Sequence, residues 1–210
     1  MTSEEARGGA PLDAGPFARW ATGMAAAIAG ERDADVPCGT CTACCRSAQF
    51  VHIGPDETDS LAHIPAALLF PAPGRPRGHV LLGYDERGHC PMLVDERCSI
   101  YSHRPRTCRT YDCRVFPACG LDADADGKPA IAERARRWRF RYPTPADRAH
   151  QEAVLAAATH VGERERAGGR SLSATRAAAA ALEIHSRFIS PAVARSRPTR
   201  SPATERQSGD

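Results

Sequence analysis

Residues 38–45 read Cys-Gly-Thr-Cys-Thr-Ala-Cys-Cys, and the fold of the chain depends on this stretch because it places four thiols within eight residues. A second set lies further along, so that the two sets hold eight of the nine cysteines: Cys90, Cys98, Cys108 and Cys113. A Cys-x-x-Cys pair brings two thiolates on one tight turn to the same ion, which is why zinc and iron sites favour it. The spacing therefore predicts a metal site.

The first set contains two overlapping pairs, Cys38 with Cys41 and Cys41 with Cys44, as in the three-cysteine runs of iron–sulfur ferredoxins. Cys45 departs from that run. Because adjacent side chains diverge, Cys44 and Cys45 do not suit one ion, and one of them is expected to serve a second metal or another face of a cluster. Eight thiolates suit two tetrahedral sites, or one cluster with spare cysteines. The ninth cysteine, Cys119, is expected to be a packed or free thiol.

Other residues near the cysteines are candidates for supporting roles. Six arginines flank them and are expected to neutralise thiolate charge: Arg46, Arg97, Arg104, Arg106, Arg109 and Arg114. Four histidines are near enough in sequence to act as ligands, although a surface or core role is favoured for each: His52, His79, His89 and His103. His89, beside Cys90, is the most ligand-like of them. Buried unligated thiols, or disulfides in an exported protein, are alternatives that the spacing disfavours.

The order of these residues resembles a known family. Cys-x-x-Cys-x-x-Cys-Cys is followed by Cys90-Pro-x-Leu, and residues 98–113 read Cys-Ser-Ile-Tyr-Ser-His-Arg-Pro-Arg-Thr-Cys-Arg-Thr-Tyr-Asp-Cys. This frame resembles the YkgJ-type cysteine-cluster family, the CxxCxxCC proteins, which are described as zinc- or iron-chelating or as containing an iron–sulfur cluster. The resemblance spans about residues 36–116 and implies that the eight cysteines are metal ligands. The family has no well-defined activity, so the biological role stays open.

Three residues of this frame, Tyr101, Arg104 and Arg109, have a physical interpretation. Arg104 precedes Pro105, which favours an extended backbone at Arg104. Its guanidinium would then point at the thiolates or at a buried carboxylate. A role in holding the loop is favoured over a catalytic role.

An acidic segment after the cysteines fits the EF-hand calcium loop at every fixed position: Asp122, Asp124, Asp126, Gly127 and Glu133. Pro117 and Gly120 interrupt the helix that would enter such a loop, and Pro129 removes a backbone N–H from its second half. We therefore interpret the segment as an acidic turn between strands. Calcium binding is disfavoured but stays open.

The apolar pattern predicts an α+β fold, with a small cysteine-rich core of short strands between flanking helices. Four residues recur at helical spacing before Gly30 and predict an N-terminal amphipathic helix: Phe17, Trp20, Met24 and Ile28. Further on, strands are expected at 49–53, 79–84 and 136–142, and a helix at 54–65. Residues 114–142 are otherwise interpreted as irregular chain and turn. In the last strand, aromatic residues alternate with arginines, which favours a half-buried strand over base stacking.

Two helices are expected near the C-terminus. Thr144-Pro-Ala-Asp opens a helix that extends to about residue 165, and an alanine-rich helix covers about residues 172–189. The predicted organisation has four parts: a disordered N-terminal segment (1–15), a cysteine-cluster metal-binding domain (16–142), a helical pair (143–190) and a disordered tail (191–210).

Composition limits the partners. Residues 129–210 hold 15 Arg and 8 acidic residues, whereas residues 1–128 hold 13 basic and 17 acidic ones. The arginines alternate with acids and alanines, which disfavours nucleic acid as a partner. No apolar run approaches the roughly 20 residues of a membrane span, and no basic export signal precedes the helix at 17–30. A reducing cytoplasm and no membrane partner are therefore expected.

We therefore expect a metal-binding protein that chelates zinc or iron, or carries an iron–sulfur cluster, through eight cysteines. One alternative is a redox or group-transfer enzyme in which Cys44 or Cys45 is a reactive thiolate. Another is a structural zinc module that presents the basic C-terminal helices to a protein partner. No Ser/His/Asp grouping, phosphate-binding glycine loop or nucleotide fingerprint supports a further enzyme class. The sequence does not choose between zinc and a cluster.

Overall fold

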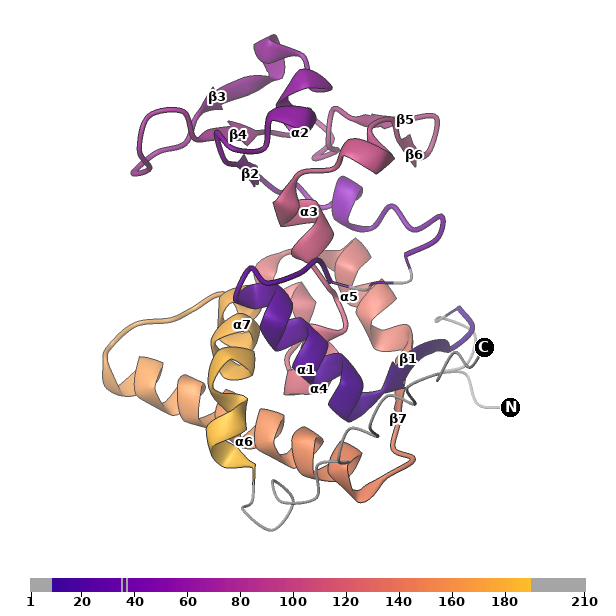
Figure 1. Cartoon of the computed structure of the whole chain (residues 1–210), viewed down its shortest axis with the longest axis vertical. Helices are drawn as coiled ribbons and strands as arrows, with labels where there is room; N and C mark the ends of the chain where they lie inside the picture. Colours follow the sequence, from indigo (N-terminus) through magenta and orange to yellow (C-terminus); the bar gives the residue numbers. More distant parts are fainter. Residues whose placement is uncertain (1–8, 35, 37, 190–210) are drawn as a thin grey trace, which may run out of the picture.

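A computed structural model describes residues 9–34, 36 and 38–189. Two lobes are stacked along the long axis of the molecule (Figure 1). The helical lobe comprises residues 12–34 and 111–189, and the sheet lobe comprises residues 48–103. The mixture of helices with short, separate sheets confirms the predicted α+β class.

The helical lobe is built on α1 (Phe17–Ile28), α6 (Pro145–Ala167) and α7 (Ala174–Ile184), which pack against one another. Phe17 and Leu182 are fully buried in their shared core. Burial of such side chains contributes about 2 kcal/mol each. All three helices confirm the sequence prediction. Helix α1 ends where the amphipathic pattern ends, because Gly30 adopts a φ of 78° that other residues rarely take.

Helix α6 is joined to α1 through its own first turn. The Asp147 carboxylate accepts hydrogen bonds from Thr144 N at 2.9 Å and Thr144 Oγ1 at 2.6 Å. It also accepts one from Ala18 N, in the first turn of α1, at 2.9 Å. The capping residues that predict the start of α6 therefore also fix the angle between two helices.

A parallel pair of strands, β1 (Leu12–Pro16) and β7 (Trp138–Arg141), closes one side of the helical lobe. Strand β7 confirms the predicted half-buried strand. The assignment of residues 1–15 to a disordered segment is wrong for residues 12–15, because their backbone pairs with that of β7. A short polar strand held by a distant partner leaves no periodic signal of its own. Residues 1–8 and the predicted disordered tail, 191–210, lie outside the described residues.

Residues 114–137 correct the prediction of irregular chain and turn. They form α4 (Val115–Cys119), the 3-10 turn η4 (Ala123–Asp126) and α5 (Pro129–Arg137). Pro129 occupies the first turn of α5, where the backbone N–H that proline lacks would have no partner within the helix. The arginines in the last turn stabilise the helix through its dipole. Ile131 and Ala135 are buried on one face.

The sheet lobe contains a three-stranded antiparallel sheet in the order β2-β4-β3 and a two-stranded hairpin, β5-β6. Its elements are β2 (Val51–Ile53), α2 (Thr58–Ala62), the 3-10 turn η2 (Ala66–Leu68), β3 (Leu69–Pro71), β4 (Val80–Leu82), β5 (Leu93–Val94) and β6 (Arg97–Cys98). The strands predicted at 49–53 and 79–84 are confirmed, and the helix predicted at 54–65 is shorter. A second small core of five buried residues holds this lobe together: Ile53, Ile64, Leu82, Met92 and Ile100.

The sheet lobe ends with the 3-10 turn η3 (Tyr101–His103), and two short elements connect the lobes: η1 (Cys44–Arg46) and α3 (Arg106–Thr110). Helix α3 lies between the two lobes in Figure 1. Among the described residues, no helix has the length and apolar character needed to cross a membrane.

Candidate metal centre

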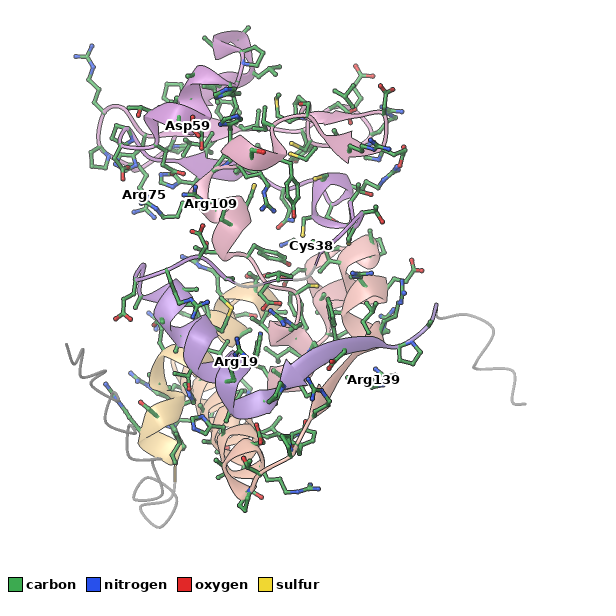
Figure 2. The ribbon with its side chains drawn as sticks, turned by 45° about the vertical axis from the view of Figure 1, so that its right-hand side comes forward. Arg19, Cys38, Asp59, Arg75, Arg109 and Arg139 are labelled. Carbon is green, nitrogen blue, oxygen red and sulfur yellow. The ribbon has the colours of Figure 1, made fainter. Side chains whose placement is uncertain are left out.

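The cysteine-rich segments meet at the junction of the two lobes. Cys38 and Arg109 both lie there, between the sheets above and the helices below (Figure 2). Cys108 lies on α3, Cys98 lies on β6, and Cys113 lies two residues before α4. The fold therefore brings the two cysteine sets of the sequence to one region, and none of the nine cysteines forms a disulfide.

The first thiol group consists of Cys38, Cys41, Cys44 and Cys113. Residue Cys44 exposes surface overall, but its sulfur is buried among the others. Burial raises the pKa of the Cys44 thiol well above its usual range, and neighbouring Cys113, Cys38 and Cys41 raise it further. Burial likewise raises the pKa of Cys113 to about 12. This group lies against the core of the helical lobe, to which Cys113 belongs.

The second thiol group consists of Cys45, Cys90, Cys98 and Cys108. Burial, then Cys90 and Cys98, raise the pKa of Cys45 to about 11. Burial, then Cys90, Cys45 and Cys98, raise the pKa of Cys108 to about 12. Cys90 and Cys98 pack against the small core of the sheet lobe. The thiols that most raise the pKa of Cys44 are therefore those of the first group, and the thiols that most raise the pKa of Cys45 are those of the second.

The two groups adjoin each other. Cys41 and Cys45 interact electrostatically, as do Cys44 and Cys45. Among the described residues, no three of the eight sulfurs lie within 4.8 Å of one another. In a tetrahedral zinc site with Zn–S bonds of about 2.3 Å, the sulfurs are about 3.8 Å apart. A single zinc ion therefore requires each group to contract, whereas a four-iron cluster offers a separate iron atom to each of four thiolates.

Two arginines act on the thiols. Arg104 lowers the pKa values of Cys38 in the first group and of Cys45 and Cys108 in the second. Burial raises the same pKa values and has the larger effect. Its guanidinium stacks 3.7 Å from the Tyr101 ring, and its Nε donates to Tyr101 O at 2.8 Å. Arg134 on α5 also favours the thiolate of Cys38. Of the two targets expected for Arg104, thiolates or a buried carboxylate, the structure selects the thiolates.

The other predicted arginines have different roles. Arg46 pairs with Glu96, Arg106 with Asp56, and Arg109 with Asp33. Arg114 pairs with the buried Asp112. Flanking position in the sequence therefore does not identify the cations that face the thiols.

Two aromatic side chains support the first thiol group. Trp138 Nε1 donates to Cys113 Sγ at 3.1 Å. The Tyr111 hydroxyl is buried without a hydrogen-bond partner among the described residues, and its pKa is raised by burial and then by Cys44 and Cys113. A buried hydroxyl costs free energy when it donates to nothing. Thiolates or sulfide held by this group would supply its missing acceptor, so the donor set and its surroundings fit a thiolate-bound metal.

Comparison with known proteins agrees with this arrangement. Residues 37–127 match the model of the CxxCxxCC family, whose description is "Putative zinc- or iron-chelating domain". The chain carries a CxxCxxCC domain. Both thiol groups lie wholly within it, whereas α5, α6 and α7 lie outside it. Neither the curated proteins nor the solved structures contain a match to the chain.

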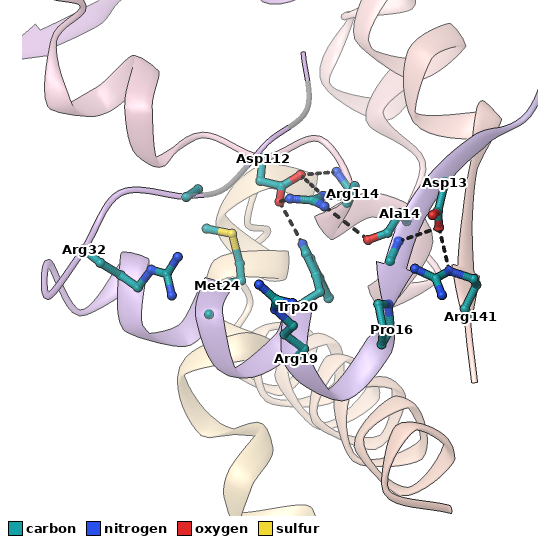
Figure 3. A pocket seen from close by; sticks show the side chains of 13 residues that line it. Asp13, Ala14, Pro16, Arg19, Trp20, Met24, Arg32, Asp112, Arg114 and Arg141 are labelled. Carbon is teal, nitrogen blue, oxygen red and sulfur yellow. Dashed lines mark hydrogen bonds and ion pairs between the residues drawn. The ribbon is translucent and has the colours of Figure 1, made fainter. Parts of the chain in front are cut away.

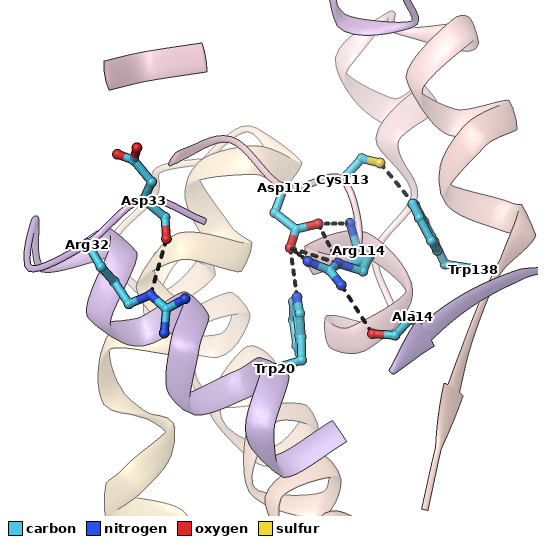
Figure 4. A network of polar contacts seen from close by, with 8 residues as sticks. All are labelled: Ala14, Trp20, Arg32, Asp33, Asp112, Cys113, Arg114 and Trp138. Atoms are coloured by element: carbon cyan, nitrogen blue, oxygen red, sulfur yellow. Dashed lines mark hydrogen bonds and ion pairs between the residues drawn. The ribbon is translucent and has the colours of Figure 1, made fainter. Parts of the chain in front are cut away.

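A buried ion pair lies directly beneath the CxxCxxCC domain's first thiol group. Asp112 Oδ2 accepts from Trp20 Nε1 at 2.8 Å and pairs with Arg114 at 2.7 Å (Figure 4). Arg114 Nη1 also donates to Ala14 O at 3.1 Å. This network ties α1 and β1 to the segment that carries Cys113, so the helical lobe positions one thiol of the group.

A cavity of about 410 Å³ lies beside this ion pair, lined by α1 and β1 (Figure 3). Its lining carries four arginines and two aspartates: Arg19, Arg32, Arg114, Arg141, Asp13 and Asp112. Asp13 pairs with Arg141 at 3.0 Å. The excess of guanidinium groups gives the cavity a potential that favours anions. None of the eight candidate ligands lines it.

The remaining candidates lie outside the thiol groups. His52 Nε2 and His79 Nδ1 are 3.0 Å apart and bond to each other. His89 is held by its backbone, which donates to Asp85 Oδ1 at 2.8 Å. Cys119 is buried in the helical core, where burial raises the pKa of its thiol to about 12. It is the packed thiol that its isolated position predicts.

The EF-hand spacing does not assemble a calcium loop. Both Asp126 oxygens bind the start of α7, accepting from Ala174 N at 2.7 Å and Thr175 N at 3.0 Å. Asp122 pairs with Arg136. Asp126 therefore caps a helix and Asp122 forms a surface ion pair. The prediction of a turn between strands is wrong in one respect, because this turn lies between the helices α4 and α5.

Sequence reasoning missed Arg134, Trp138 and Asp112 as neighbours of the thiols. Trp138 was predicted to be buried but had no assigned partner. Arg134 lies in α5, four residues before Trp138, which begins β7, and its guanidinium is 5.1 Å from the indole ring. The sequence prediction of irregular chain over α5 hid this proximity.

Proposed function

We propose that the chain is a metal-binding protein whose eight cysteines hold two metal centres, four thiolates to each. The observation that carries this proposal is that the two adjacent cysteines interact most strongly with different thiols, Cys44 with Cys113, Cys38 and Cys41 and Cys45 with Cys90 and Cys98. A run of four cysteines that served one ion would direct both side chains inward. The resemblance of the Tyr101–Cys113 frame to YkgJ-type proteins supports the same donor set.

Zinc and iron–sulfur clusters are the cofactors that this donor set favours, since thiolates are soft ligands. The separation of the sulfurs, the unpartnered Tyr111 hydroxyl and the Trp138 N–H all suit clusters, whose sulfur atoms accept hydrogen bonds. When bound, such a centre supplies electron transfer if it is a cluster, or rigidity if it is zinc. The protein supplies the thiols, the Arg104 charge and a junction between two small cores.

The reactive-cysteine alternative is less well supported. A nucleophilic cysteine requires a lowered pKa and access to a substrate. The pKa values of both Cys44 and Cys45 are raised instead, by burial first and by neighbouring thiols second.

Nine cysteines without a disulfide favour a reducing compartment such as the cytoplasm.

The test is the metal and acid-labile sulfide content of protein purified without oxygen, together with its visible spectrum. Brown protein with iron and sulfide would support clusters. Colourless protein with about two zinc ions per chain would support structural sites. One metal ion per chain would contradict two centres, and protein that keeps its circular dichroism spectrum and thiol reactivity after chelation would contradict ligation altogether.

A further inference from the structure

A second set of metal-binding side chains lies in the sheet lobe, away from both thiol groups. Asp59 belongs to α2, His63 follows the last residue of that helix, and His103 ends η3. One ligand atom from each of the three lies within 4.8 Å of the other two. Asp59 is labelled in Figure 2, on the sheet lobe above Cys38.

The carboxylate of Asp59 faces both imidazole rings. His103 Nδ1 lies 2.9 Å from Asp59 Oδ2 and 3.1 Å from Oδ1. His63 Nδ1 lies 3.8 Å from Asp59 Oδ1, and it bonds to the Asp59 carbonyl oxygen at 2.8 Å. Asp59 and His63 are four residues apart and lie on one helical face. The third ligand, His103, is brought to them by the tertiary structure.

The two rings are held in register. Their centroids are 3.5 Å apart and their planes differ by 7°. A divalent ion placed between the rings and Asp59 would join both imidazoles to that carboxylate.

We propose that Asp59, His63 and His103 form a divalent metal site for an ion of the zinc, iron(II) or cobalt(II) class. Two imidazoles and one carboxylate are ligands that such ions accept, and three protein ligands leave positions open to water or to a substrate. The side chains are 67%, 41% and 39% exposed, respectively, so an ion enters directly from solvent. Binding of an ion at this site does not depend on the proposal for the cysteines, whereas its effect on the second thiol group does.

The ion would connect two segments of the sheet lobe. Ile64 follows His63, and Ile100 precedes η3, and both are buried in the small core that packs against Cys90 and Cys98. Metal bound at the surface therefore crosslinks α2 to the loop between Cys98 and Cys108. We therefore expect the second thiol group to retain its metal more tightly in this chain than in a variant that lacks the surface site.

The test uses the full chain with its cysteine-bound metal already in place. Cobalt(II) is then added, and binding is followed by calorimetry and by the visible spectrum. Wild-type protein is expected to take up one additional ion, with the weak d–d bands of nitrogen and oxygen ligands and without new thiolate charge-transfer bands. Uptake is expected to weaken at least tenfold on acidification, because protons compete with the ion for both imidazoles.

Asp59→Asn and His103→Phe should each abolish this uptake. The matched control is His79→Phe, which removes one ring of another stacked pair, His52 with His79, whose ring nitrogens bond to each other. Circular dichroism and the content of cysteine-bound metal show whether each variant is folded. Equal cobalt uptake by wild type and Asp59→Asn would overturn the proposal. It would also be overturned if added cobalt produced only thiolate charge-transfer bands, since the ion would then be bound by cysteines. Loss of uptake in His79→Phe would also overturn it.

Discussion

Cys90 N donates a hydrogen bond to Cys45 O at 2.7 Å, and this bond joins the two cysteine-containing segments of the CxxCxxCC domain. The two residues are far apart in sequence, yet their thiols belong to one group. Cys44, the neighbour of Cys45, belongs to the other. A main-chain contact between separate loops therefore anchors Cys45 beside the second thiol group.

Replacing one cysteine should affect one centre only. In Cys38→Ser and in Cys98→Ser, we expect the bound metal to fall by about half, because each variant leaves the opposite group of four thiolates complete. Metal content per folded chain is the measurement. Cys119→Ser is the control and should retain all metal. Complete loss of metal in both Cys38→Ser and Cys98→Ser would show that the two groups form one centre.

Arg104 should support both centres. Removing its charge in Arg104→Gln is expected to weaken metal affinity about 10- to 100-fold, as is typical when an outer partner of metal ligands is lost. Competition with a chelator measures this change. Arg104→Lys keeps the charge and should recover part of the affinity.

Arg46→Gln is the matched control for Arg104. Arg46 follows the cysteine run directly but pairs with the exposed Glu96. Its loss should change metal affinity by less than about threefold, since exposed ion pairs contribute little. Equal effects of the two variants would mean that Arg104 acts only through general charge.

The Trp138 N–H should stabilise the first thiol group. Trp138→Phe keeps an aromatic ring in the core but removes the donor to Cys113 Sγ. We expect the metal-loaded protein to lose about 1–2 kcal/mol of unfolding free energy, measured in urea, because a hydrogen bond to a charged acceptor is lost. In a cluster-containing protein, the reduction potential should also fall. Unchanged stability and unchanged metal retention would argue against this contact.

The buried pair of Asp112 and Arg114 should matter more than an exposed pair. Asp112→Asn removes the carboxylate that accepts from Trp20 and Arg114, and breaking a buried ion pair from one side costs about 3–5 kcal/mol. Asp13→Asn breaks the exposed pair between Asp13 and Arg141, whose side chains are 61% and 59% exposed, and should destabilise the fold far less. Denaturant unfolding of both variants checks the difference.

Asp147 should make stability depend on acid pH. Burial raises its pKa, but hydrogen bonds from Thr144 and Ala18 outweigh this effect and hold the pKa below its ordinary value. The folded pKa is therefore lower than the unfolded one. The ionised carboxylate stabilises the fold fully above about pH 4, and this contribution is lost as the pH falls through the folded pKa.

Comparison of wild type with Asp147→Asn isolates this effect from metal release, which both proteins share. The difference in unfolding free energy should be about 1–2 kcal/mol at pH 7 and should shrink as the pH falls below about 4. A difference that stays constant with pH would assign the effect to packing rather than to charge.

The sequence by itself determined the elements whose signals are local. The periodic apolar residues of α1, the Thr144–Asp147 cap of α6 and the alternation in β7 each lie within a few residues, so short-range sterics and hydrogen bonding fix them. The cysteine spacing likewise predicts the CxxCxxCC domain. The family match bears out that prediction.

Only the tertiary structure decided which cysteines share a group, because the thiols come from loops separated by tens of residues. It also decided that β1 pairs with β7 and that Arg104 and Arg134, rather than the other nearby arginines, face the thiols. The Asp59, His63 and His103 cluster arises in the same way, since its third ligand comes from a distant turn. Packing of two small cores against one junction is the physical cause in each case, and no local pattern in the chain encodes it.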